Sequence, residues 1–247
     1  MGVGRHLMIP SPAFGRDIHL WQYGWYGEPV IVFPTAAGFA HEWNAQGMIE
    51  ALAPLLGAGK IKLYCPESNV SEAWTKKDLD PAFRIGRHLV YERFVMETLV
   101  PYIREDCRLP KARMSVVGAS LGGMYAANFA LKFPETFPWS LSMSGRYLAT
   151  EFTAGFNSQD VYFNNPLAYV PNLVGDALER VRRNTHLVMV CGTGKWEEGC
   201  IEETIALCDR FEQKGISHTR DIWGRDSIHD WNWWKKQAVH HLGRRFG

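Results

Sequence analysis

One short stretch, residues 116–123 with the sequence VVGASLGG, constrains the fold of this chain more than any other. It predicts a buried strand, a sharp turn at Ser120 and the start of a tightly packed helix. The spacing Gly118-x-Ser120-x-Gly122 is that of a nucleophile elbow, in which the serine has a strained backbone and glycines let neighbouring segments pass closely. The same spacing occurs by chance in ordinary Gly- and Ala-rich turns, so this interpretation depends on partners elsewhere. Small residues continue along the expected helix at Gly123, Ala126, Ala127 and Ala130.

Short apolar runs alternate with helical patterns along the chain. The expected strands, besides the one before Ser120, are residues 7–9, 18–21, 30–33, 61–65, 139–145, 186–191 and 218–223. The expected helices, besides the one that follows Ser120 and ends before Pro134, are residues 48–56, 91–102, 201–214 and 231–242. This order predicts an α/β fold in a single domain, residues 1–247, with a mostly parallel central sheet flanked by helices on both faces. Sites in such sheets lie at the carboxyl ends of the strands, where Ser120 is expected.

Residues 146–171 show neither a helical nor a strand period and are rich in Asn, aromatic and turn-forming residues. A bare loop of this length in a compact domain is typical of a functional segment near the site, but an irregular, packed excursion is an equally open alternative. Nothing in the sequence predicts a large lid domain.

Composition and charge exclude several classes of function. The formal net charge of +1 gives no field that would attract nucleic acid or anionic lipid, and no apolar run reaches the length of a membrane span. The five cysteines are widely spaced, with no C-x-x-C pair, as expected for reduced thiols; with no signal-peptide pattern, we expect a cytoplasmic protein. No H-E-x-x-H motif or paired Cys/His spacing indicates a metal, and we expect no cofactor.

A nucleophilic serine needs a base and an acid, and in elbow-type sheets they follow in the order serine, acid, histidine. Only His229 lies in a loop directly after the last expected strand and before the last helix, so it is the predicted base. The acid should follow the strand 186–191, where Glu197 is the first choice and Glu198 the second. Asp209 and Asp160 are outside candidates, and either glutamate could instead supply first-turn charge for the next helix.

Acyl transfer also needs N–H donors directed at the oxyanion. One donor should be the backbone N–H of Leu121, the residue after the serine. The other should come from the loop after the strand 30–33, from Thr35 or Ala36.

Three stretches together carry a family resemblance: residues 118–123 (GASLGG), the Trp196-Glu197 loop and residues 229–234 (HDWNWW). From about Val30 to its end, the chain resembles the esterase branch of the α/β-hydrolases, which includes esterase D or S-formylglutathione hydrolase, feruloyl esterases, polyhydroxybutyrate depolymerase-like proteins and mycolyltransferases. The resemblance implies an α/β-hydrolase fold, with Ser120 as nucleophile, His229 as base, Glu197 or Glu198 as acid, and oxyanion donors at Leu121 and near Thr35. Esterase D has an aspartate as its acid, so its thiol-ester substrate is not implied.

The sequence therefore predicts a serine esterase that acts through a Ser-His-Glu triad and a covalent acyl-enzyme on small short-chain or aryl esters. The alternatives are an acyltransferase with the same triad and a non-catalytic binding protein on the same fold. Natural substrate, acyl length and oligomeric state are left open. Candidate walls of the substrate site, each of which taken alone is more readily explained as a core residue, are Trp74, Tyr125, Trp196 and Trp231.

Overall fold

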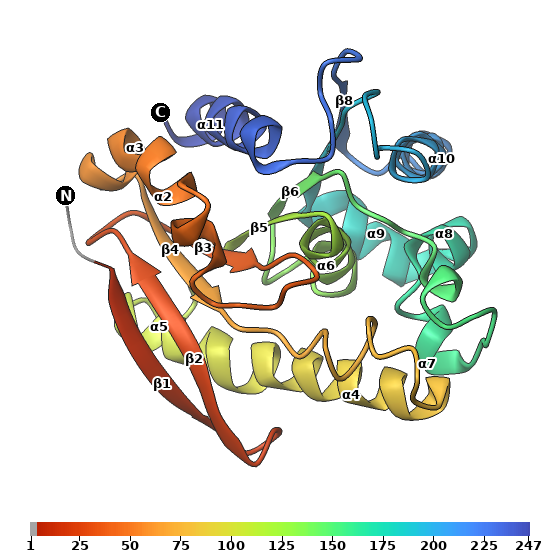
Figure 1. Cartoon of the computed structure of the whole chain (residues 1–247), viewed down its shortest axis with the longest axis horizontal. Helices are drawn as coiled ribbons and strands as arrows, with labels where there is room; N and C mark the ends of the chain where they lie inside the picture. The colour runs from red at the N-terminus through yellow and green to blue at the C-terminus, as the bar shows by residue number, and fades with distance from the viewer. Residues whose placement is uncertain (1–3) are drawn as a thin grey trace.

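A mixed sheet runs through the centre of the computed structural model, which describes residues 4–247 (Figure 1). Its strands are β1 (Arg5–Ser11), β2 (Arg16–Tyr23), β3 (Glu28–Phe33), β4 (Ile61–Pro66), β5 (Ser115–Ala119), β6 (Trp139–Met143), β7 (His186–Cys191) and β8 (His218–Ile222), in the order β1-β2-β4-β3-β5-β6-β7-β8. The β1–β2 hairpin pairs antiparallel with β4, whereas β4, β3 and β5 to β8 run parallel. The predicted mostly parallel sheet is confirmed.

The helices cover both faces of this sheet. They are α1 (Glu42–Ala45), α2 (Met48–Ala51), α3 (Ala53–Gly57), α4 (Pro81–Phe94), α5 (Val100–Asp106), α6 (Leu121–Lys132), α7 (Gln159–Tyr162), α8 (Pro166–Tyr169), α9 (Gly175–Asn184), α10 (Cys200–Lys214) and α11 (Trp231–Phe246). Shorter turns are the π-helical η1 (Val95–Leu99) and the 3₁₀ helices η2 (Ala149–Glu151) and η3 (Val170–Asn172). Between residues 4 and 247, no helix has both the length and the apolar character needed to cross a membrane.

Alternate residues of the inner strands face two hydrophobic clusters, one on each side of the sheet. In β3, Ile31 and Phe33 belong to the larger cluster, to which α4, α6, α9 and α10 contribute, whereas Val30 and Val32 belong to the smaller one with α2, α3 and α11. Successive side chains of a strand point to opposite faces, so a strand buried on both faces needs apolar residues at every position. This requirement explains the unbroken apolar run in β3.

Several predicted boundaries differ from the structure. The single helix predicted over residues 48–56 is wrong: the chain leaves helical geometry at Leu52 (φ −93°, ψ 4°), and Pro54 opens the separate helix α3. The helix predicted over residues 91–102 is part of a longer helical run from α4 through η1 to α5. Pro101 has no N–H to donate to the helical ladder, which makes a π turn just before it.

The strand predicted over residues 139–145 ends at Met143, because Ser144 has a positive φ of 49° that a strand does not accommodate. Helix α9 was not predicted. Its apolar positions Leu178 and Val181 lie one turn apart among charged residues, which leaves a short period to detect.

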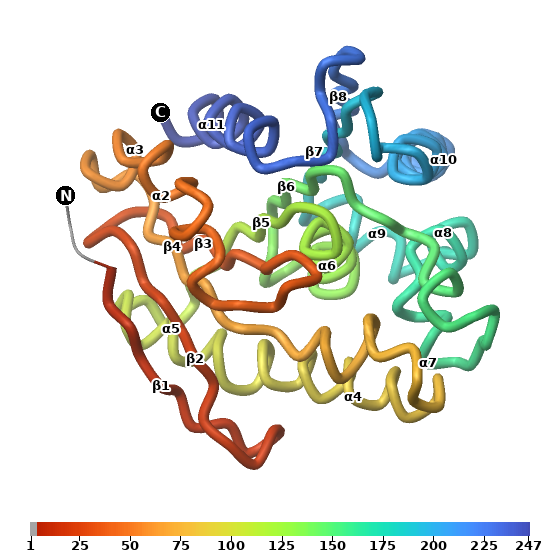
Figure 2. Tube along the Cα trace, viewed as in Figure 1, coloured from red at the N-terminus to blue at the C-terminus, as the bar shows by residue number. Residues whose placement is uncertain are grey.

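The segment predicted as irregular, residues 146–171, contains η2, α7, α8 and the start of η3 (Figure 2). The chain leaves β6, passes α7 beside α4 and returns through α8 to α9. Asn164 is fully buried and its side-chain oxygen bonds His88, 3.0 Å away, and Asn128, 2.9 Å away. This segment is therefore a packed excursion over the larger cluster.

Candidate active site

Ser120 stands at a strained turn between β5 and α6. Its φ of 55° and ψ of −124° lie outside the regions that most residues adopt. A Cβ atom on Gly118 would lie 2.1 Å from the Gly122 oxygen, and one on Gly122 would lie 2.3 Å from the oxygen of Phe33. Only glycine fits at both positions, so the G-x-S-x-G spacing has a steric cause here.

The structure brings Ser120, His229 and Glu197 together from three separate loops at the carboxyl edge of the sheet. The Ser120 Oγ lies 3.0 Å from His229 Nε2, and His229 Nδ1 lies 3.1 Å from Glu197 Oε2. The Glu197 side chain is 1% exposed, whereas 21% of the His229 side chain is exposed. The hydroxyl therefore has a base within hydrogen-bond reach, and the base has a buried carboxylate behind it.

The Glu197 carboxylate is held by further residues that sequence reasoning did not identify. Its Oε1 accepts a hydrogen bond from Ser144 Oγ at 2.6 Å, and Ser144 Oγ accepts one from Trp234 Nε1 at 3.1 Å. Trp234 also packs edge-on against the His229 ring, with the ring centroids 4.8 Å apart. In the sequence, these residues are visible only as a tryptophan-rich start of α11 and as a serine directly after β6. Neither feature predicts a contact with Glu197.

Two thiols lie beside the same carboxylate. Cys191 Sγ is 3.4 Å from Glu197 Oε2, and Cys200 Sγ is 3.9 Å from His229 Nδ1. Burial, together with the nearby Glu197 charge, raises the pKa of Cys200 to about 12, and burial likewise raises the pKa of Cys191. Both thiols are thus neutral at physiological pH and leave the carboxylate as the charged partner of His229.

The other acid candidates lie elsewhere. Glu198 is exposed, and its neighbour Glu197 makes the contact with His229. Asp209 forms an ion pair with Arg220 at 2.5 Å, and Asp160 lies in the first turn of α7.

The loop after β3 presents a different donor from the first choice. The Thr35 N–H donates to Glu42 Oε2 at 2.8 Å, so the first-choice oxyanion donor is already occupied and that prediction is wrong in this structure. The second choice, Ala36, is exposed, and its N–H makes no hydrogen bond to any residue from 4 to 247. Leu121 is the first residue of α6, where an N–H has no helical acceptor. Ala36 and Leu121 therefore offer the free N–H groups.

Two predicted walls of the substrate site are core residues instead. Trp74 is 1% exposed and donates its Nε1 hydrogen to His88 Nδ1 at 3.2 Å. Tyr125 is fully buried on α6, where it packs against Phe33. Trp196 is 59% exposed and Trp231 is half-buried, and they stand next to Glu197 and close after His229 in the chain. The wall prediction is wrong for Trp74 and Tyr125.

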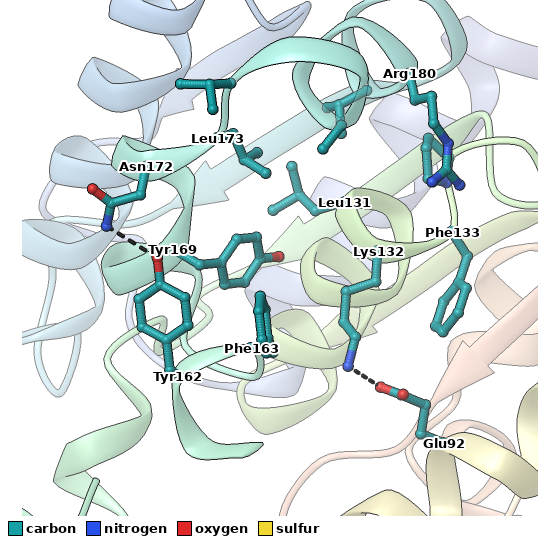
Figure 3. A pocket seen from close by; sticks show the side chains of 14 residues that line it. Glu92, Leu131, Lys132, Phe133, Tyr162, Phe163, Tyr169, Asn172, Leu173 and Arg180 are labelled. Atoms are coloured by element: carbon teal, nitrogen blue, oxygen red, sulfur yellow. Dashed lines mark hydrogen bonds and ion pairs between the residues drawn. The ribbon is translucent and has the colours of Figure 1, made fainter. Parts of the chain in front are cut away.

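A separate cavity of about 460 Å³ lies at the other end of α6 from Ser120 (Figure 3). Leu131, Phe163, Tyr169 and Leu173 give it an apolar lining, and an ion pair between Lys132 and Glu92 stands at its rim. None of the side chains around Ser120 lines this cavity.

Two groups of side chains have ligand atoms close enough to hold one metal ion, within 4.8 Å of one another. The first, Glu197, Cys200 and His229, uses the same atoms that connect His229 to its carboxylate. The second comprises Asp221, His240 and His241, and in it His241 Nε2 bonds Asp221 Oδ2 at 2.9 Å. Each group offers three protein ligands, whereas closed structural zinc sites have four.

Comparisons with known proteins agree on one family. A family model described as "Putative esterase" matches residues 29–244, from β3 to the last turns of α11. Among sequence relatives, the diacylglycerol acyltransferase/mycolyltransferase Ag85C of Mycobacterium leprae (strain TN) is 20% identical, over 95% of this chain and 78% of that protein. The resemblance predicted from the sequence is confirmed.

Solved structures with the same fold include two enzymes of ester chemistry. A ferulic acid esterase superposes with a TM-score of 0.77 at 16% identity, over 99% of this chain and 98% of that one. The S-formylglutathione hydrolase FrmB of Staphylococcus aureus superposes with a TM-score of 0.74 at 14% identity, over 99% and 96% of the two chains. At such identities the likeness establishes the fold alone, and it confirms the predicted α/β-hydrolase fold.

Proposed function

This chain belongs to the esterase family, and from that premise we propose that it is a serine esterase that hydrolyses short-chain or aryl esters through a covalent acyl-enzyme. Family membership makes its chemistry the hydrolysis of carboxylic esters or the transfer of their acyl group. The observation that carries the finer assignment is the pair of hydrogen bonds at His229, to Ser120 at 3.0 Å and to Glu197 at 3.1 Å. This arrangement gives a weak nucleophile its base and gives the base its orienting acid.

In the first step, Ser120 Oγ attacks the ester carbonyl carbon while His229 Nε2 takes the hydroxyl proton. The imidazolium that forms is stabilised by the buried Glu197 carboxylate, to which its Nδ1–H donates. Ser144 holds the other carboxylate oxygen, so the acid keeps one orientation throughout the reaction. His229 then protonates the leaving alcohol, and the acyl group remains on Ser120 as an ester.

The negative charge that develops on the carbonyl oxygen requires donors already in position. We assign this role to the N–H groups of Leu121 and Ala36, which are free of partners in the described chain. Each such donor contributes about a hundred- to a thousandfold in rate.

In the second step, His229 removes a proton from water, and the hydroxide attacks the acyl-enzyme. The tetrahedral intermediate uses the same two N–H donors, and its collapse returns the proton from His229 to Ser120 Oγ. The balance is one ester and one water consumed, with one carboxylic acid and one alcohol released.

The short-chain or aryl class is supported by the exposed surroundings of the site. His229 is partly exposed; Trp196 stands on the loop that carries Glu197, and Trp231 opens α11 two residues after His229. Partly exposed tryptophans suit the flat, apolar part of an aryl ester.

An acyltransferase is the second candidate, and one observation favours it. Ag85C, the relative that shares 20% of its residues over 95% of this chain, is named a diacylglycerol acyltransferase/mycolyltransferase. The same triad would then deliver the acyl group to an alcohol instead of water. Product analysis with and without an added alcohol acceptor separates the two: a growing share of transferred acyl product at saturating acceptor would favour the transferase.

A fluorophosphonate probe tests the central assignment, because it phosphonylates only an activated serine. We expect labelling of the folded protein, with the adduct mapped to Ser120 by peptide mass spectrometry. Labelling should be lost in the Ser120→Ala and His229→Ala variants and in heat-denatured protein. An unlabelled Ser120 in folded wild-type protein would contradict the proposal and favour a non-catalytic binding protein.

A further inference from the structure

The loop after β3 is held by a buried carboxylate, that of Glu42. Both of its oxygens accept hydrogen bonds from one residue of the loop, Thr35. Glu42 is 7% exposed. Its Oε2 accepts the Thr35 N–H at 2.8 Å, and its Oε1 accepts the Thr35 hydroxyl hydrogen at 2.5 Å. A carboxylate accepts hydrogen bonds without donating any, so it matches two donors from a single residue.

Thr35 in turn closes the turn that contains Ala36. Its carbonyl oxygen accepts the Gly38 N–H at 3.1 Å, and its Oγ1 accepts the Ala37 N–H at 3.3 Å. The bond from Gly38 to Thr35 defines a four-residue turn with Ala36 in the second position, where the N–H has no acceptor within the turn. Glu42 thus occupies the Thr35 N–H, and the turn leaves the Ala36 N–H available.

The two residues directly before the turn lie against the serine elbow. The backbone oxygens of Phe33 and Pro34 are so near Gly122 that a Cβ there would lie 2.3 and 2.6 Å from them. On its other side, the Gly38 carbonyl oxygen accepts the Ser68 N–H at 2.9 Å. A movement of this turn would therefore change the spacing between the Ala36 N–H and the Leu121 N–H at the start of α6.

Burial of a carboxylate without a cation is costly, so its presence needs a reason. No ion pair within residues 4–247 involves Glu42. Burial raises the pKa of Glu42, and the two Thr35 hydrogen bonds and the nearby His41 oppose that rise. The hydrogen bonds to Thr35 are thus the main local compensation for the buried group.

We propose that Glu42 is a positioning residue for the esterase reaction, which holds the Thr35–Gly38 turn so that the Ala36 N–H, and not the Thr35 N–H, faces the developing oxyanion. The inference rests on the proposed function, because it concerns the donor geometry of that same site. Glu42 touches neither substrate nor Ser120 and acts only through Thr35. By holding the donor in place, Glu42 stabilises the transition state, in which the oxyanion forms. It does not change the affinity for the substrate in the ground state.

The Glu42→Gln variant tests this role because it replaces one carboxylate oxygen by an NH₂ group with little change of shape. A glutamine amide offers one acceptor and one donor group, so one of the two Thr35 donors meets a donor instead of an acceptor. We expect kcat on a p-nitrophenyl ester to fall by about 10- to 100-fold with KM within about threefold, as for partial loss of one oxyanion donor. The rate of fluorophosphonate labelling at Ser120 should fall in parallel.

Glu28→Gln is the matched control. Glu28 also has a pKa raised by burial and a hydroxyl partner, Ser115, but it stands at the start of β3, away from the site. We expect this variant to retain wild-type kcat. A kcat loss in Glu28→Gln equal to that in Glu42→Gln would show a general folding effect and overturn the positioning role.

A pair of Thr35 variants keeps the test open if Glu42→Gln folds poorly. Thr35→Ser retains both donors and should keep kcat near the wild-type value, whereas Thr35→Val loses the hydroxyl and should lower kcat with little change in KM. Equal kcat in both variants, or a Glu42→Gln protein labelled at the wild-type rate, would overturn the inference alone. A wild-type protein that the probe does not label at Ser120 would instead overturn the proposed function.

Discussion

His229 and His88 each have both ring nitrogens hydrogen-bonded, yet their surroundings differ completely. His229 bonds a serine hydroxyl and a carboxylate, and 21% of its side chain is exposed. His88 is fully buried and bonds Trp74 Nε1 at 3.2 Å and Asn164 Oδ1 at 3.0 Å, which are neutral groups. His229 lies at the edge of the sheet beside Ser120, whereas the His88 ring packs against Trp74 and Tyr125 of the larger hydrophobic cluster.

The two rings differ in whether their surroundings allow them to take up a proton. Burial, with a smaller effect of the Lys132 charge, lowers the pKa of His88 to about 3, so this ring stays neutral at all physiological pH values. Its Nδ1 accepts the Trp74 hydrogen, so its Nε2 carries the hydrogen that Asn164 accepts. His229 has a carboxylate where His88 has an amide, and its Nε2 lies 3.0 Å from the Ser120 hydroxyl, whose proton it takes in the proposed reaction. Whether a histidine with both ring nitrogens hydrogen-bonded is structural or catalytic therefore depends on the chemistry of its partners and not on the number of its hydrogen bonds.

The largest effect is expected from removing the catalytic member of this pair. We expect His229→Ala to lower kcat/KM by about 10⁴-fold or more, roughly 5.5 kcal/mol of transition-state stabilisation, because Ser120 loses its base. The melting temperature should change little, since the ring is partly exposed. Steady-state kinetics on p-nitrophenyl esters, with circular dichroism of the same samples, makes the measurement. Retention of a tenth or more of wild-type activity would contradict the assignment of His229 as base.

The carboxylate behind His229 is tested next. Glu197→Gln keeps the shape of the side chain and removes its charge, and we expect a loss of about 10³- to 10⁴-fold in kcat. Glu198→Gln is the matched control, since this neighbour is exposed, and its activity should equal that of the wild type. A larger loss in Glu198→Gln than in Glu197→Gln would show that the other glutamate is the acid.

Replacement of His88 should affect stability and leave the chemistry intact. His88→Leu removes the ring that bonds Trp74 and Asn164, and leaves a buried indole N–H without its acceptor. We expect a loss of about 2 kcal/mol in the free energy of unfolding, measured by urea denaturation. Fluorophosphonate labelling of the folded protein should proceed at the wild-type rate. A labelling rate reduced tenfold or more in folded protein would make His88 part of the catalytic apparatus.

Sequence order alone distinguished these two histidines, because His88 precedes Ser120 and His229 follows the last strand. The strands β3 and β7 were predictable for a related reason: both are buried on both faces, so the apolar runs 30–33 and 187–191 are unbroken. The elbow was predictable because glycine is required at both of its positions for steric reasons. A Cβ on Gly118 would clash with Gly122, four residues away, and a Cβ on Gly122 would clash with the end of β3.

The remaining parts of the site depend on contacts between distant segments. Trp234, Ser144 and Glu197 form their hydrogen bonds only after three loops meet, and no local pattern encodes that meeting. The choice between the Thr35 and Ala36 donors likewise depends on Glu42, whose carboxylate carries no signature in the sequence. Trp74 and Tyr125 were misassigned as walls because composition shows an aromatic residue without showing which side of α6 or of a loop it faces.

The smallest expected effect sharpens the comparison through pH. For His88 the unfolded chain binds a proton near the ordinary pKa of 6.5, whereas the native protein resists until about 3. The unfolded state thus holds more protons between these values, and native stability falls as the pH falls. Protonation of His88 in the unfolded chain should therefore lower the free energy of unfolding by about 2 kcal/mol when the pH falls from 7 to 5. Carboxylates add their own pH dependence, so the measurement is the difference between wild-type protein and His88→Leu in urea denaturation at both values. Identical pH dependence in the two proteins would show that His88 is accessible to protons in the native state, and the contrast with His229 would then fail.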